Sequence, residues 1–163
     1  EKKYGLIENV NLYNSAVCIS SDDKKFFFEG YDGINNMGGG ASLAPFKTDR
    51  AYRSHQEKIE TKNSHISVKC TDISRFILDL GNQVDFLKLN IEGTEYLIID
   101  KLIDSGAIFK INNILLSDHT DCFAHIEFLK FSLKTLKKLD KLKKEGTVKT
   151  KVYFWDESEW LNV

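Results

Sequence analysis

Two pairs of polar side chains are the strongest candidates for chemistry in this sequence. Asn90 and Glu92 follow one apolar run, and Asp118 and His119 follow the next. A histidine beside a carboxylate is suited to general-base chemistry, because the carboxylate orients the imidazole ring and increases its basicity. An equally good alternative is that Asp118 only caps its loop and that His119 is an exposed loop residue.

The two apolar runs are expected to be buried strands, each followed by a helix. The run 84–89 carries only Lys88 as a charge, and after its polar turn apolar residues recur at helical spacing until Gly106. The second run, 111–116, precedes a longer amphipathic helix that ends near Gly146. Ligands of open α/β sheets bind outside the carboxyl ends of the strands. If the two strands are neighbours, the two polar pairs therefore line one crevice.

The same pattern predicts which side chains are buried. A central parallel strand is covered on both faces, so four side chains are expected to be nearly fully buried: Leu87, Leu89, Leu97 and Ile114. The long helix is expected to bury a stripe of Ile126, Leu129, Leu133, Leu136 and Leu139. The lysines between 130 and 144 then lie on its solvent face. A solvated face is favoured over a nucleic-acid patch, because no aromatic platform accompanies these lysines.

The N-terminal part is expected to begin with two paired strands. The first strand is predicted over residues 10–19, and the second, over 25–29, is predicted to pair back on it. The following stretch, 30–65, has no periodicity. Its glycine-rich segment 33–40 is not followed by the helix start that a phosphate site needs, so a surface loop is favoured. A loop of this kind is also a candidate lid over a site.

A short strand and a capped helix are predicted next. Residues 65–70 alternate as a strand, and Thr71 or Asp72 is expected to cap the helix that follows. A last strand is predicted over 148–155. Strands that alternate with helices indicate an α/β fold, with a mostly parallel sheet and helices on both of its faces.

Length and composition narrow the class of protein. The chain has 163 residues, of which 42% are hydrophobic, so a single domain over residues 1–163 is expected. The net charge of −1 gives no indication of a nucleic-acid partner or an anionic membrane. No apolar run approaches the roughly 20 residues that span a bilayer. The chain begins with Glu1, and its single methionine, Met37, is internal, so we interpret it as part of a longer protein.

The three cysteines are an odd number and lie far apart in the sequence. Cys18, Cys70 and Cys122 match neither a disulfide framework nor a zinc ligand set, so they are interpreted as buried thiols. No metal site is predicted. Reduced thiols are consistent with a reducing, cytoplasmic location.

The central stretch also resembles a known family. Residues 85–95, DFLKLNIEGTE, resemble the D-x-L-K-x-D/N-x-E-G-x-E signature of FkbM-family methyltransferases. Residues 9–17 resemble the strand that leads to the small-residue A-V site of that family, and residues 68–73 resemble the lead into its T-L-D helix. Residues 114–119 resemble its hydrophobic strand followed by an acid and a histidine. The resemblance extends from about residue 8 to 146.

The resemblance implies a class I, Rossmann-like fold that uses S-adenosylmethionine to methylate hydroxyls of sugars or natural products. It implies that Ala16 and Val17 lie near the adenine of the cofactor and that Asn90 and Glu92 lie at the methyl-transfer edge. His119, on the neighbouring strand end, is then the group that takes the hydroxyl proton. Asp118 is expected to assist His119, and Glu92 to orient a small-molecule or glycan substrate.

Part of the family pattern is absent from this sequence. The first strand of the family, its glycine-rich turn and the acidic strand end that holds the ribose are expected to precede Glu1. Asn90 stands where the family often has aspartate. The chain is therefore interpreted as the C-terminal part of such an enzyme, without the N-terminal cofactor-binding part. The alternative is a non-catalytic binding or structural module that retains the fold.

Overall fold

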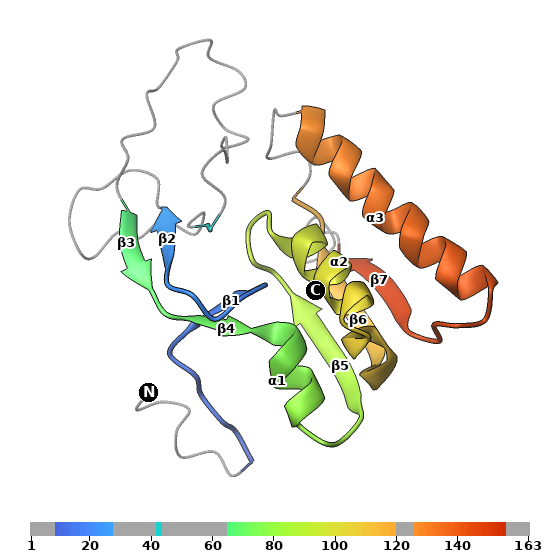
Figure 1. The fold of residues 1–163 in the computed structure, drawn as a ribbon, viewed down its shortest axis with the longest axis horizontal. Helices are drawn as coiled ribbons and strands as arrows, with labels where there is room; N and C mark the ends of the chain where they lie inside the picture. The colour runs from blue at the N-terminus through green and yellow to red at the C-terminus, as the bar shows by residue number, and fades with distance from the viewer. Residues whose placement is uncertain (1–8, 28–41, 44–64, 120–125, 156–163) are drawn as a thin grey trace, which may run out of the picture.

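The computed structural model of the protein describes residues 9–27, 42–43, 65–119 and 126–155, which form a mixed α/β structure (Figure 1). The helices and strands, in chain order, are β1 (Ala16–Cys18), β2 (Lys24–Phe27), β3 (His65–Val68), β4 (Cys70–Asp72), α1 (Ile73–Asp79), β5 (Val84–Leu89), α2 (Glu95–Asp104), the 3₁₀ helix η2 (Ala107–Lys110), β6 (Ile111–Ser117), α3 (Ile126–Lys144) and β7 (Lys151–Trp155). The predicted loop 33–40 and Cys122 lie outside the described residues.

The largest of the described sheets is parallel and consists of β5, β6 and β7 in that order. Leu89 of β5 lies opposite Leu116 of β6, and Leu116 lies opposite Phe154 of β7. The prediction that the strands ending near residues 90 and 116 are neighbours is confirmed. Since the strands are parallel, their carboxyl ends lie at the same edge of the sheet.

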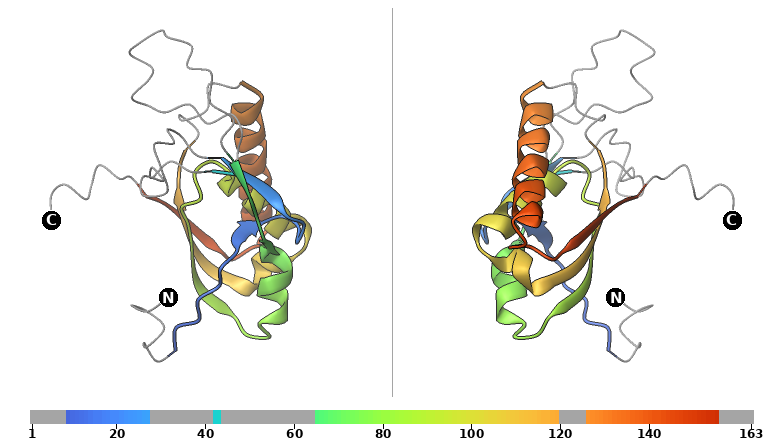
Figure 2. Two further views of the ribbon diagram at one scale, coloured as in Figure 1. Left: turned by 90° about the vertical axis from the view of Figure 1, so that its left-hand side faces the viewer. Right: turned by 90° about the vertical axis from the view of Figure 1, so that its right-hand side faces the viewer.

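Helices α1, α2 and α3 all lie on the same side of this sheet (Figure 2). Parallel crossovers are right-handed, so β5, β6 and β7, which succeed one another in a single direction across the sheet, place both connecting helices on one face. The prediction of helices on both faces is therefore wrong for the described residues. Phe86, on the opposite face, is 55% exposed, and on that face the Lys88 Nζ lies 3.5 Å from the centre of the Trp155 ring.

The hydrophobic core lies between the sheet and these helices. Leu89 and Ile114 are buried as predicted, and they pack with residues of α2 such as Ile99 and Leu102. Two residues that were predicted to be nearly fully buried are not. Leu87 is only partly buried, because β5 is an edge strand of the described sheet, and Leu97 is 36% exposed, because it faces away from the sheet.

The N-terminal strands form two small sheets that differ from the predicted hairpin. β1 pairs in parallel with β4, and β2 pairs in an antiparallel manner with β3. The predicted pairing of the second strand with the first is therefore wrong, and the predicted strand 65–70 is divided into two. The predicted cap is confirmed, because the Asp72 carboxylate accepts hydrogen bonds from the backbone amides of Ser74 and Arg75 at 3.0 and 3.2 Å.

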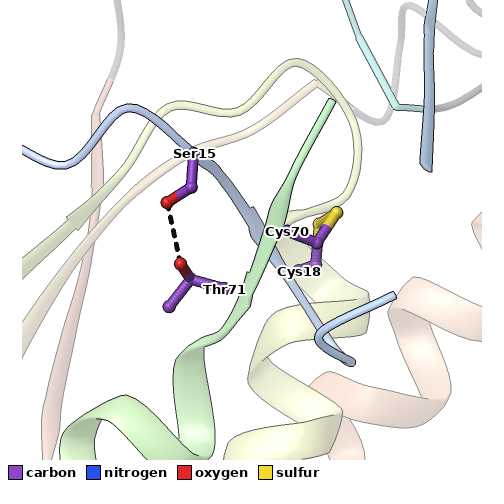
Figure 3. Close-up of a disulfide and its surroundings, with 4 residues drawn as sticks. All are labelled: Ser15, Cys18, Cys70 and Thr71. Atoms are coloured by element: carbon purple, nitrogen blue, oxygen red, sulfur yellow. Dashed lines mark hydrogen bonds between the residues drawn. A yellow bond between two sulfur atoms is a disulfide. The ribbon is translucent and has the colours of Figure 1, made fainter. Parts of the chain in front are cut away.

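The pairing of β1 with β4 brings two cysteines together. Cys18 and Cys70 form a disulfide, although they are 52 residues apart in sequence (Figure 3). Beside it, the hydroxyls of Ser15 and Thr71 are hydrogen-bonded at 2.7 Å. The interpretation of these cysteines as separate thiols is wrong, since chain spacing gives no information about strands that pair over a long loop. They therefore do not support the reducing location predicted from them.

Helix α3 packs on α2 through a face that differs from the predicted leucine stripe. Leu139 is buried and Leu136 is partly buried against the core, as predicted, but Leu129 and Leu133 are exposed, and the small residues Ser132 and Thr135 are buried instead. The side chain of Ile126 lies outside the described part of the structure. Lys138 donates hydrogen bonds to Asp100 at 2.8 Å and to Asp104 at 2.5 Å. These contacts hold the two helices in register. None of the helices in the described ranges has the length and apolar character of a membrane span.

Candidate active site

The polar turn between β5 and α2 has an unusual backbone. Glu92 has a φ of 59° and Gly93 a φ of 108°. Positive φ angles are easily adopted by glycine and are uncommon for glutamate, for which they cost about 1 kcal/mol or more. The strained turn keeps Glu92 at the carboxyl edge of the sheet, where a side chain can reach a ligand.

Glu95, the first residue of α2, holds this turn in place. Its side chain is buried, and it accepts hydrogen bonds from the backbone amides of Ile91 at 2.9 Å and Gly93 at 2.8 Å. A carboxylate at a helix N-terminus is also favoured by the helix dipole. These interactions offset the free-energy cost of burying the Glu95 carboxylate. They also fix the backbone on both sides of Glu92.

His119 lies between two glutamates. Its Nδ1 is 2.7 Å from Oε1 of Glu95, and its Nε2 is 3.5 Å from Oε1 of Glu92. His119 is 8% exposed, which excludes the alternative of an exposed loop residue. The predicted convergence of Glu92 and His119 across neighbouring strand ends is confirmed.

Asp118 lies beside this group but has a different partner. Burial raises the pKa of Tyr96 well above its usual value, and the charge of Asp118 and a hydrogen bond between Tyr96 and Asp118 raise it further. Tyr96 therefore remains protonated and donates to the Asp118 carboxylate. The carboxylate with a direct hydrogen bond to the His119 ring is Glu95, a residue to which the sequence analysis assigned no role.

A signal for Glu95 was present in the sequence. It stands three residues after Glu92, at the expected start of a helix, where an acidic side chain readily accepts hydrogen bonds from turn amides. Its contact with His119 depends on the positions of β5 and β6 in space. The spacing of residues along the chain gives no information about that contact.

The other predicted site residues lie on two different sheets. Asn90 follows β5 directly and is exposed beside Glu92. Ala16 and Val17 belong to β1, which is not paired with β5 in the described part of the chain. Val17 nevertheless lines a cavity together with Thr94, the residue that precedes α2. β1 is thus brought to the same end of α2 as the turn.

Residue 42 connects a further segment to the turn. The Ser42 hydroxyl donates a hydrogen bond to the backbone carbonyl of Glu92 at 2.5 Å, and Ser42 is buried. Within the described ranges, no group of three or more histidine, cysteine or acidic side chains is arranged to hold a metal ion. The chemistry that the described side chains support is proton transfer at His119, with two carboxylates to orient the ring and a bound group.

Comparison with known proteins gives one assignment. Residues 5–144 match the family model described as methyltransferase FkbM domain. No curated protein and no solved structure matches the chain. The matched region contains β1 to β6 and α3, and therefore Glu92, Glu95, Asp118 and His119. The chain belongs to the FkbM methyltransferase domain family.

Proposed function

We propose that the protein transfers a methyl group from S-adenosylmethionine to a hydroxyl of a small-molecule or glycan acceptor, with His119 as the group that takes the proton. The observation that supports this proposal is the position of His119, buried at the carboxyl edge of the sheet between Glu92 and Glu95. A methyltransferase family and a histidine held by carboxylates are together typical of hydroxyl methylation with general-base assistance.

The described residues fit part of the cofactor by their chemistry. The exposed side-chain amide of Asn90 both donates and accepts hydrogen bonds, which suits the charged groups of a methionine moiety. The small apolar residues Ala16 and Val17 suit one side of an adenine ring. When bound, S-adenosylmethionine supplies an electrophilic methyl group on a sulfonium, which an acceptor oxygen attacks in line.

The two carboxylates give His119 a defined direction of proton transfer. Glu95 accepts a hydrogen bond from Nδ1–H, so Nε2 is the unprotonated nitrogen of the neutral ring. Nε2 points towards Glu92 across 3.5 Å, which is longer than a strong hydrogen bond. An acceptor hydroxyl bound within hydrogen-bond reach of Nε2 transfers its proton to that nitrogen as its oxygen takes the methyl group, and the imidazolium that forms is stabilised by both glutamates.

Glu92 is proposed to orient the acceptor, and Asp118 to assist His119 from the neighbouring position in the chain. Glu92 is held by the strained turn and by Ser42, so its carboxylate is positioned before the acceptor binds. Such preorganisation accelerates a bimolecular transfer, because both reactants must meet at near-attack distance. Asp118 binds Tyr96 and places a further negative charge next to the site of the imidazolium.

The proposal is tested by following a radioactive methyl group. The full-length protein is incubated with S-adenosylmethionine labelled in its methyl group and with a panel of hydroxylated sugars and aromatic natural products. We expect transfer to a hydroxyl oxygen of at least one acceptor class, identified by mass spectrometry. If the folded protein binds the cofactor but transfers the label to nitrogen or carbon atoms, the proposed reaction is wrong. If it binds no cofactor, the alternative of a non-catalytic module is correct.

A further inference from the structure

Tyr96, the second residue of α2, is the largest fully buried side chain in the described part of the chain. Its ring belongs to the core between α2 and the sheet, which also contains Leu89 of β5 and Leu116 of β6. Phenylalanine would fill the same space without a hydroxyl that must be removed from water. Packing therefore accounts for the ring of Tyr96 and not for its hydroxyl.

The hydroxyl of Tyr96 has a partner at the carboxyl end of the sheet. It is hydrogen-bonded to the carboxylate of Asp118, the residue that follows β6. Burial and the charge of Asp118 raise the pKa of Tyr96 well above its usual value, so the hydroxyl remains protonated and donates this bond. Asp118 is exposed, and water would hydrate its carboxylate without Tyr96. What the bond adds is a fixed position for Asp118.

Two consecutive residues of α2 thus hold two consecutive residues after β6. The Glu95 carboxylate is 2.7 Å from Nδ1 of His119, and the Tyr96 hydroxyl binds Asp118. The pairing of β6 with β7 ends at Ser117, so the sheet itself does not extend to these two residues. A contact at the ring alone leaves the backbone beneath it less defined than contacts at two successive residues.

We propose that Tyr96 is a positioning residue of the candidate active site, and that it holds the His119 imidazole against Glu95 by fixing Asp118. Tyr96 is buried, so it acts through Asp118 rather than by contact with a reactant. A catalytic group must be held within about 0.5 Å and 10–20° of its productive geometry, so a bond one residue away from the base affects the rate. This inference rests on the proposed function for its effect on methyl transfer, whereas the position of the ring does not depend on that function.

The position of the ring is tested without any substrate. Tyr96→Phe removes the hydroxyl and keeps the ring in the core. NMR of histidine-labelled protein detects the Nδ1 proton of His119, whose signal is assigned by its absence from His119→Ala. Opening of the contact with Glu95 exposes this proton to solvent, so Tyr96→Phe should speed its exchange about threefold to tenfold, the effect of one hydrogen bond. The control is Tyr153→Phe, which changes a half-exposed tyrosine of β7 and should leave the exchange rate unchanged.

Two variants of Asp118 show whether Tyr96 acts through this residue. Asp118→Asn keeps an acceptor oxygen for the Tyr96 hydroxyl and should retain slow exchange at His119. Asp118→Ala removes the acceptor and should speed the exchange as much as Tyr96→Phe does. The double variant Tyr96→Phe with Asp118→Ala should then be no faster than either single variant, because both remove the same bond. Additive effects of the two substitutions would overturn the route through Asp118.

The effect on the reaction is measured in the full-length protein. Tyr96→Phe should lower kcat about tenfold, which is less than the roughly 10²-fold that a misplacement of about 1 Å costs, and leave KM for the acceptor and the dissociation constant of S-adenosylmethionine unchanged. Cooperative urea unfolding shows that the variant is folded.

The outcomes distinguish this inference from the proposed function. Exchange at the wild-type rate in Tyr96→Phe would overturn the positioning role, and so would a wild-type kcat despite faster exchange. Faster exchange in a protein that transfers no methyl group would sink only the proposed function, because the ring would still be held through Tyr96. Methyl transfer that depends on His119 but not on Tyr96 would sink only this inference.

Discussion

Replacement of Glu95 by alanine should destabilise the protein more than replacement of any exposed acid. The Glu95 carboxylate accepts hydrogen bonds from the amides of Ile91 and Gly93 and contacts Nδ1 of His119, at distances of 2.7–2.9 Å. Alanine leaves these three groups without that partner. A buried donor that loses its partner costs about 1–3 kcal/mol.

The expected loss is about 3–5 kcal/mol. Three orphaned groups would give more, but the Ile91 amide is only partly buried, and the variant no longer has to desolvate a carboxylate. Glu95→Gln keeps the shape but turns one acceptor oxygen into a donor that faces another donor. It should therefore still lose about 1–3 kcal/mol.

Urea unfolding followed by circular dichroism measures these losses as shifts of the midpoint at constant slope. The control is Glu145→Ala, which removes a half-exposed acid paired with Lys141 and should change the free energy of unfolding by less than about 0.5 kcal/mol. If Glu95→Ala and Glu145→Ala were equally stable, the carboxylate would not hold the turn, and the account of how Glu92 and His119 are positioned would be refuted.

Three further predictions concern the fold. Leu89→Ala should lower the free energy of unfolding by about 2–5 kcal/mol in the same assay, because Leu89 is fully packed; a loss below 1 kcal/mol would contradict the packing. Asp72→Ala should lose about 1 kcal/mol of helix capping at neutral pH. Burial raises the pKa of Asp72, but hydrogen bonds from Ser74 and Arg75 and the charge of Lys101 lower it overall, so this contribution should be complete above pH 3.8 and disappear as the pH falls further. A loss that is independent of pH would contradict the cap. Cys18→Ser opens a loop with a separation of 52 residues and should cost about 2–4 kcal/mol under oxidising conditions; in excess reductant the difference from the wild type should vanish.

The sequence correctly predicted structural features that depend on residues within a single segment of the chain. The apolar run 84–89, the polar turn after it and the helix from Glu95 were all predicted from local pattern, and so was the Asp72 cap. Each of these depends on alternation, helical spacing or capping within about ten residues, which are properties that a single segment determines.

The contacts that the sequence did not predict are long-range. The Cys18–Cys70 disulfide and the pairing of β2 with β3 depend on segments separated by a long loop. The partner of His119 was assigned to its neighbour Asp118, whereas the direct hydrogen bond comes from Glu95 on another element. The placement of helices on one face follows from strand order, which periodicity does not report.

The most direct test of the account compares His119→Ala with His65→Ala. Both variants lose one imidazole, but His65 is an exposed residue of β3, on a different sheet. In the full-length protein, methyl transfer to the identified acceptor is measured beside the dissociation constant of S-adenosylmethionine. Loss of a positioned general base lowers the rate by roughly 10²–10⁴-fold. We predict a loss of this size for His119→Ala, with unchanged cofactor affinity, and a wild-type rate for His65→Ala. A wild-type rate for His119→Ala would show that His119, held between Glu92 and Glu95, does not take the proton.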